Sequence, residues 1–165
     1  MYTGGPFPLG YNGLGDIFVF VYFGIVATMT TYYLNTLEWS SMSFWASVIP
    51  GALSTNILVV NNLRDVAQDK LSGKKTLGVL LGEKALQWEY TLLLALALAI
   101  PPHFYFRLDA SLCIFFPYLS VPLCLKLLAE IWSHQKKSTL NGTLEKTAAF
   151  MFIYGVLFTI GLLIP

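Results

Sequence analysis

Charged residues are scarce in this chain. Only 12% of its 165 residues are charged and 56% are hydrophobic, whereas charged residues make up about a quarter of an ordinary soluble domain. The net charge is +1, so the protein has no strong positive field to attract nucleic acid. These shortages exclude a soluble domain of ordinary composition and a nucleic-acid-binding protein. They predict an integral membrane protein instead.

Cysteine and histidine are also rare, with two residues each. Cys113 and Cys124 fall in one apolar segment, where eleven helical residues separate them by about 16 Å, too far for a disulfide. His103 and His134 fall in different loops. The sequence contains no nucleophile–base pair, glycine-rich nucleotide loop or Cys-x-x-Cys motif. Thiol, zinc and nucleotide chemistry are therefore not indicated.

Long apolar segments are what the sequence does contain. Crossing a bilayer takes about 20 helical residues, and five segments approach this length: 16–34, 43–62, 85–101, 110–131 and 146–164. We expect the third of them to end at Pro101-Pro102. No repeat or linker divides the chain, so one domain or part of one is expected. The predicted fold is an all-α integral membrane protein with about five transmembrane helices in the lipid bilayer.

Basic residues are unevenly distributed between the two sides that alternating spans would create. Arg107 is the only one on one side, and Lys126 lies within a span and is not counted. The other side holds Arg64, Lys70, Lys74, Lys75, Lys84, Lys136, Lys137 and Lys146. By the positive-inside rule, loops 63–84 and 132–146 should face the cytoplasm.

Polar residues concentrate in residues 61–76, which read Asn-Asn-Leu-Arg-Asp-Val-Ala-Gln-Asp-Lys-Leu-Ser-Gly-Lys-Lys-Thr. If the second helix continues to about residue 70, Asn61, Asp65 and Asp69 share one face, and Asn62 lies one step round. Carboxylate and amide oxygens suit Mg²⁺, which keeps several waters and bridges to phosphate. The loop after this helix carries Lys74 and Lys75, which are suited to close over a diphosphate.

Other interpretations of this segment stay open. Arg64 is equally suited to bind phosphate, to pair with a carboxylate or to lie at lipid headgroups. The whole cluster could also be a solvated helix end whose basic residues reach anionic lipid, because Asp-x-x-x-Asp often occurs by chance. The spacing alone does not decide between these interpretations.

The long motif resembles a known family. Residues 61–77, followed by Leu81-Gly82-Glu83, look like the second aspartate-rich motif of the UbiA-type membrane prenyltransferases, most similar to the MenA branch that acts on 1,4-dihydroxy-2-naphthoate in menaquinone and phylloquinone synthesis. The opening Tyr2–Tyr11 stretch and Gly13-Leu-Gly-Asp16 resemble that family's loop before its fifth helix. Leu144-Glu-Lys-Thr147 resembles the start of its last helix.

The resemblance implies a nine-helix, all-α bundle around a central cavity, in which two aspartate-rich motifs hold magnesium on a polyprenyl diphosphate. An aromatic acceptor, dihydroxynaphthoate in this branch, then takes the prenyl chain and loses its carboxyl group. By motif position, Asp65 and Asp69 correspond to the catalytic magnesium ligands. Asn61, Asn62, Arg64, Lys74 and Lys75 correspond to substrate-binding positions. Apolar walls from the first three segments would hold the isoprenoid tail.

The chain departs from the family pattern in two ways. Leu80 stands where the family often has arginine, which removes one basic contact. The first aspartate-rich motif is missing, since the only other aspartates are Asp16 and Asp109. Residues 1–165 therefore resemble the carboxy-terminal portion of a single UbiA-type domain. We expect this chain by itself to hold half of a metal site and to have no measurable prenyl transfer.

Two other functions compete with the enzyme. One is a non-catalytic, truncated membrane protein that binds lipid or quinone, and the other is a small transporter. The polar residues of the second segment suit a transporter, but the other spans lack deep charges. A bacterial inner membrane is the expected location, and a plastid membrane would give the same sequence pattern.

Overall fold

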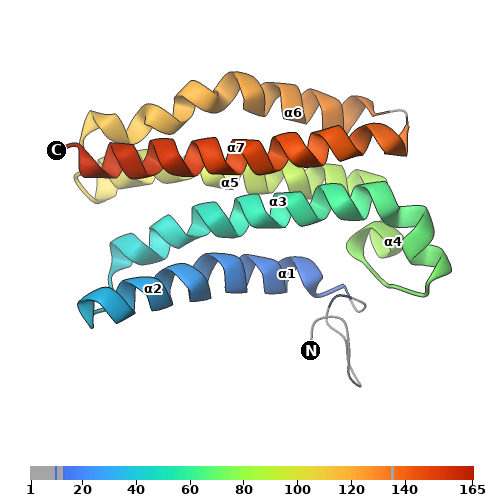
Figure 1. Ribbon diagram of the computed structural model, residues 1–165, viewed down its shortest axis with the longest axis horizontal. Helices are drawn as coiled ribbons and strands as arrows, with labels where there is room; N and C mark the ends of the chain where they lie inside the picture. The colour runs from blue at the N-terminus through green and yellow to red at the C-terminus, as the bar shows by residue number, and fades with distance from the viewer. Residues whose placement is uncertain (1–9, 11–12, 135) are drawn as a thin grey trace.

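The computed structural model of the protein describes residues 10, 13–134 and 136–165. In this part of the chain every regular element is a helix, and the long helices lie side by side, as Figure 1 shows. The Tyr2–Tyr11 stretch lies outside the described residues, apart from Gly10.

The chain forms five long helical segments. The first joins α1 (Gly15–Val19), the π-helix η2 (Phe20–Val26) and α2 (Ala27–Thr36). The second is α3 (Ser41–Leu71), which is followed by the short α4 (Leu77–Leu81) and then by the third, α5 (Glu83–Arg107). The 3₁₀-helix η3 (Leu112–Ser120) continues into α6 (Val121–Ser133), and η4 (Lys137–Thr139) continues into α7 (Leu140–Leu163).

Helix α3 is the central element of the bundle. Ser40 begins it, because its Oγ accepts a hydrogen bond from the Met42 N–H at 3.1 Å, and Ser, Thr, Asp and Asn are the preferred residues at this position. The helix passes through Pro50 without a break. Its 31 residues extend over about 46 Å, longer than the roughly 30 Å hydrocarbon core of a bilayer. One end of α3 must therefore project beyond the core.

Two glycines bring the first helix close to α3. A Cβ atom on Gly24 would lie 2.6 Å from the Gly51 Cα and 2.7 Å from the Ser47 carbonyl oxygen. Small residues allow this kind of close approach between membrane helices. Gly24 and Gly51 therefore serve the packing of these two helices.

The predicted end of the third segment is wrong. Helix α5 continues through Pro101 and Pro102 to Arg107. A helical proline leaves the carbonyl four residues earlier without its usual N–H partner, here Ala97 and Leu98. Tyr154 donates its hydroxyl to the Ala97 oxygen at 2.8 Å, and Tyr118 donates to the Leu98 oxygen at 2.8 Å. Two tyrosines from other helices thus replace the lost backbone bonds.

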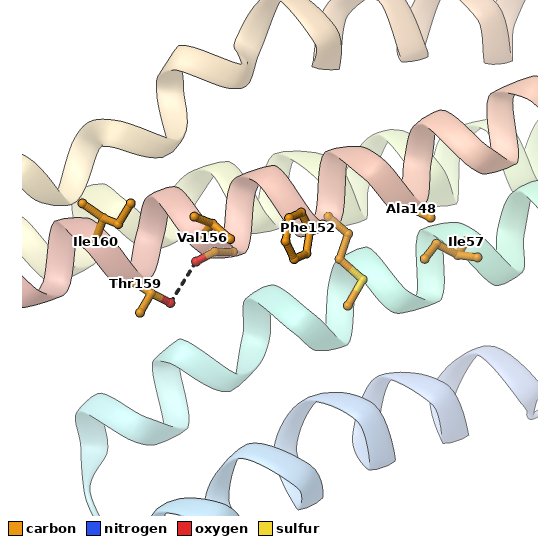
Figure 2. Close-up of a pocket in the computed structure, with 8 residues that line it drawn as sticks. Ile57, Ala148, Phe152, Val156, Thr159 and Ile160 are labelled. Carbon is orange, nitrogen blue, oxygen red and sulfur yellow. Dashed lines mark hydrogen bonds between the residues drawn. The ribbon is translucent and has the colours of Figure 1, made fainter.

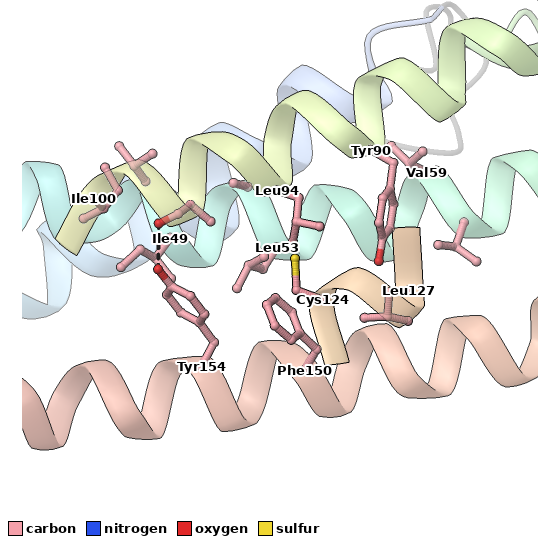
Figure 3. Close-up of a cluster of buried hydrophobic side chains, with 14 of the residues drawn as sticks. Ile49, Leu53, Val59, Tyr90, Leu94, Ile100, Cys124, Leu127, Phe150 and Tyr154 are labelled. Carbon is pink, nitrogen blue, oxygen red and sulfur yellow. Dashed lines mark hydrogen bonds between the residues drawn. The ribbon is translucent and has the colours of Figure 1, made fainter. Parts of the chain in front are cut away.

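The hydrophobic core lies where α3, α5, α6 and α7 meet. Figure 3 shows Tyr90, Tyr154 and Phe150 among aliphatic side chains from these helices. The buried Tyr90 hydroxyl lies 3.1 Å from the Thr147 hydroxyl, so the core places its aromatic rings where their polar ends have partners.

Four helical segments of the described chain are long and apolar enough to cross a membrane: Gly15–Thr36, Ser41–Leu71, Leu112–Ser133 and Lys137–Leu163. Among these, α3 is the most buried and the first helix the least. The remaining long helix, α5, is not one of these four, and its first turns carry Glu83, Gln87 and Glu89. The predicted all-α integral membrane protein is confirmed.

Candidate functional site at one end of the bundle

The predicted site lies at the carboxyl end of α3. The helix continues to Leu71, so Asp65 and Asp69 lie one turn apart, as the sequence predicted. The start of α5, the end of α6 and the start of α7 lie at the same end of the bundle, on the right in Figure 1. Polar side chains from these helices therefore meet there.

Arg64 holds Asp65 with two parallel hydrogen bonds. Its Nε donates to Asp65 Oδ1 at 2.7 Å, and its Nη2 donates to Asp65 Oδ2 at 2.6 Å. The two side chains are 29% and 32% exposed, respectively. Of the three roles that the sequence left open for Arg64, the structure shows the carboxylate pair. A bidentate pair of this kind fixes the orientation of both side chains as well as neutralising the carboxylate.

Two amide oxygens hold the same guanidinium. Arg64 Nη2 donates to Asn61 Oδ1 at 2.7 Å, one turn earlier on α3, and Nη1 donates to Asn141 Oδ1 at 3.0 Å on α7. Sequence reasoning missed Asn141 as a site residue. One signal could have found it: Asn141 lies in loop 132–146, which the distribution of basic residues places on the same side of the membrane as Arg64.

Asp69 pairs with the loop that follows α3. Its side chain is 4% exposed and its Oδ1 accepts a hydrogen bond from Lys74 Nζ at 2.7 Å. The chain turns back through Gly73, whose φ of +73° favours glycine. Lys75 is exposed. The loop therefore brings one of the two predicted lysines onto the motif and leaves the other in solvent.

Asn62 lies on a different face of α3. It is 7% exposed, and its Nδ2 donates to Asp16 Oδ1 at 3.4 Å. Asp16 lies in the first turn of α1 and is itself buried. The structure therefore brings together Asn61, Arg64 and Asp65 and places Asn62 with Asp16 instead.

A second ionic cluster fastens α3 to the neighbouring loop. Lys137 Nζ donates to the Leu63 carbonyl oxygen at 3.0 Å and to Glu83 Oε2 at 2.6 Å. His134 Nε2 lies 3.5 Å from the same Glu83 oxygen. Glu83 precedes the 85–101 span, and its hydrogen bond from Lys137 lowers the pKa of the carboxyl below its ordinary value. This cluster fixes the backbone next to Arg64.

The metal-binding atoms that the motif offers are of the element that magnesium prefers. Asp65, Asp69 and Asn61 offer only oxygen, which Mg²⁺ prefers, and Mg²⁺ is typically bound through one or two carboxylates plus phosphate and water. In residues 10, 13–134 and 136–165, no group of three or more His, Cys, Asp or Glu side chains could hold a metal. The described residues fit one face of a magnesium site.

An apolar groove runs along α7 toward this end. One part, of about 500 Å³, lies between Ile57 of α3 and the α7 face from Ala148 to Ile160, as Figure 2 shows. A second part, of about 290 Å³, shares Met151, Gly155 and Thr159 and extends to Thr28 of α2. The first two segments line this groove together with α7, and a separate cavity of about 300 Å³ is lined by all three of the first segments, at Phe20, Thr55 and Leu93 among others.

Comparison with known families decides where the chain belongs. The model of the UbiA prenyltransferase family matches residues 1–162. The chain belongs to this family. The resemblance that the motif carried is thereby confirmed, and the four apolar helices of the described residues make this a multi-pass membrane protein.

Individual relatives indicate which branch of the family the chain is similar to. The chain is 35% identical to a 1,4-dihydroxy-2-naphthoate octaprenyltransferase of Haemophilus influenzae, covering 99% of the chain and 53% of the relative. It is 35% identical to the enzyme of that name from Mycobacterium tuberculosis, over 94% of the chain and 52% of the relative. The Bacillus subtilis enzyme is 30% identical, with 99% and 53% covered. The chain thus spans about half the length of the curated relatives it matches.

Proposed function

We propose that the chain forms part of a prenyltransferase that moves an isoprenyl group from a polyprenyl diphosphate to an aromatic acceptor. Family membership and the relatives' names support this reaction. The observation that carries the proposal is a pair of carboxylates, Asp65 and Asp69, one turn apart at the polar end of a membrane helix, each beside a cation. Opposite charges at that place suit a diphosphate with its metal.

The proposed acceptor is 1,4-dihydroxy-2-naphthoate. In the proposed reaction the bond between the prenyl carbon and the diphosphate oxygen breaks, and a carbon–carbon bond to the ring forms while the acceptor's carboxylate leaves as CO₂. The diphosphate departs with the electron pair of the broken bond. The transition state separates an allylic cation from an anion, so fixed charges at the leaving group lower its energy.

The residues of the chain have distinct roles in this proposal. Asp65 and Asp69 would hold Mg²⁺, directly or through water, and this ion would supply Lewis-acid stabilisation of the diphosphate. Arg64, Lys74 and Lys75 supply positive charge for the phosphate oxygens. Asn61 orients Arg64. Asn62, which bonds Asp16, acts on the position of α3 rather than on the substrate.

The apolar groove is the proposed place for the isoprenoid tail. Its near end, at Ile57 and Ala148, lies seven residues from Arg64 on α3 and seven from Asn141 on α7. Seven helical residues extend about 10 Å, so a diphosphate at Arg64 could continue into a tail in the groove. We also propose a bacterial inner membrane with loop 63–84 on the cytoplasmic side, where a soluble acceptor would arrive.

The deciding experiment replaces Asp65 and Asp69 with Asn in the native gene and measures prenyl transfer in isolated membranes. We expect each variant to lower the magnesium-dependent rate about 100-fold or more, since it removes a charge that holds the metal against the leaving group. Asp109→Asn, in the turn after α5, is the matched control and should leave the rate unchanged. Full activity in both motif variants would contradict the proposal and favour a binding protein.

The chain by itself should lack this activity, because its described residues include no group of three or more His, Cys, Asp or Glu side chains that could hold a metal. Magnesium-dependent transfer by the purified 165-residue chain would show that this expectation is wrong.

A further inference from the structure

Both oxygens of the Asp65 carboxylate are occupied by one guanidinium. Arg64 Nε and Nη2 donate to Oδ1 and Oδ2 at 2.7 and 2.6 Å. A metal ion that chelates both oxygens of Asp65 from this side must displace Arg64, and one that takes a remaining lone pair lies close to its positive charge. Chelation of a metal by Asp65 and the Arg64–Asp65 pair therefore compete in this geometry.

The guanidinium keeps partners when it leaves Asp65. Asn61 Oδ1 accepts from Nη2 and Asn141 Oδ1 accepts from Nη1, and neither amide carries a charge that would compete with an anion. Both members of the pair are about 30% exposed, so ions from solution can reach them. The two asparagines thus hold Arg64 at the motif without neutralising it.

We propose that Arg64 is an exchangeable latch on Asp65. It neutralises this carboxylate until a divalent cation takes it, and the released guanidinium, held by Asn61 and Asn141, then binds a phosphate oxygen of the diphosphate. The latch rests on the function proposed above for the same site. It makes Asn141 a positioning residue, contributed by a helix that the motif itself does not include.

Coupling between the two ligands follows from the exchange. Without diphosphate, a metal ion must displace Arg64 and leave a positive charge next to itself, which weakens its binding. When diphosphate is present, the displaced guanidinium gains an anionic, bidentate partner. Metal and diphosphate should therefore each bind more tightly in the presence of the other, and Arg64 should carry part of this cooperativity.

Manganese binding to the purified product of the native gene in detergent tests the latch without any activity measurement. Free Mn²⁺ is measured by electron paramagnetic resonance, with and without inorganic pyrophosphate. We expect Arg64→Gln to bind Mn²⁺ about three- to tenfold more tightly than the native chain when pyrophosphate is absent. Adding pyrophosphate should raise the Mn²⁺ affinity of this variant less than it raises that of the native chain. Arg107→Gln, an exposed change at the last residue of α5, is the matched control and should leave both affinities unchanged.

Two further variants keep the test decisive if Arg64→Gln does not fold. Arg64→Lys retains the charge but cannot make the bidentate pair, so its Mn²⁺ affinity should lie between those of the native chain and Arg64→Gln. Asn141→Leu leaves the Arg64–Asp65 pair in place, so it should keep Mn²⁺ affinity within twofold and weaken the cooperativity with pyrophosphate at least threefold. Helix content by circular dichroism verifies folding of each variant.

Opposite results overturn the latch. Unchanged or weaker Mn²⁺ binding by Arg64→Gln, including no binding at all, means that Arg64 does not compete with the metal. Asp65→Asn separates this failure from failure of the proposed function. If Asp65→Asn loses Mn²⁺ while Arg64→Gln gains nothing, the metal site stands and the latch is wrong. If Asp65→Asn binds Mn²⁺ like the native chain, the metal-ligand assignment is wrong.

Discussion

Individual polar side chains in this bundle differ sharply in whether they have partners. Asn62 and Asn56 are both buried on α3, but Asn62 donates to Asp16 while neither Asn56 Oδ1 nor Asn56 Nδ2 has a hydrogen-bond partner among the described residues. Asn56 is 0% exposed. A buried amide without partners costs about 1–3 kcal/mol, so the residue is a weak point of the isolated chain.

Asn56→Leu should raise the unfolding temperature of the detergent-solubilised chain, because it replaces an unpaired amide with an apolar group of similar size. The expected gain is about 1–3 kcal/mol in unfolding free energy. Thermal unfolding followed by circular dichroism measures it. Asn62→Leu is the matched control and should lower the unfolding temperature, since it leaves Asp16 without its donor. A lower unfolding temperature for Asn56→Leu would contradict this account of the unpaired amide.

Contacts between elements explain where the helices begin, approach and end. The Gly24–Gly51 crossing holds the first helix against α3. On the other side, α5 passes through Pro101 because the Tyr154 hydroxyl from α7 satisfies the Ala97 carbonyl, a bond drawn as the dashed line in Figure 3. The straight course of one helix thus depends on a side chain from another.

Tyr154→Phe removes that hydroxyl and leaves the buried Ala97 carbonyl unpaired. We expect a loss of about 1–3 kcal/mol in unfolding free energy. The control is a double-mutant cycle with Pro101→Ala, because alanine restores the backbone N–H that bonds this carbonyl. In the Pro101→Ala background, Tyr154→Phe should cost markedly less, as thermal unfolding would measure. Equal costs in both backgrounds would contradict the replacement of the backbone bond by the tyrosine.

Across the whole molecule, charge and apolar surface are separated. Arg64, Lys74, Lys137 and Lys146 all make ion pairs at the end where α3 stops and α7 begins. Arg107 lies at the far end of α5. Large apolar side chains along the helices remain exposed, including Phe23, Leu92 and Phe152, as lipid contact requires. The basic end should therefore face the cytoplasm.

Cysteine labelling tests this orientation. In a Cys113→Ser, Cys124→Ser background, Lys75→Cys should react with a membrane-impermeant maleimide only in inside-out vesicles. Arg107→Cys, at the opposite end of the bundle, should react only in right-side-out cells. The reverse pattern would place the candidate site on the outer face and remove its access to a cytoplasmic acceptor.

The sequence by itself determined the local features of this protein. Hydropathy was enough to predict an all-α membrane protein, and the four-residue spacing of Asp65 and Asp69 puts them one turn apart because α3 continues to Leu71. These properties depend on residues within a few positions of one another. The motif also sufficed to identify the family.

Only the tertiary structure decided which side chains meet. The bond from Arg64 to Asn141 joins residues 77 positions apart, that from Asn62 to Asp16 spans 46, and that from Tyr154 to Ala97 spans 57. Local spacing carries no information about such pairs. For the same reason the sequence placed the end of the third helix at Pro101-Pro102, because the hydroxyls that compensate for these prolines come from distant helices.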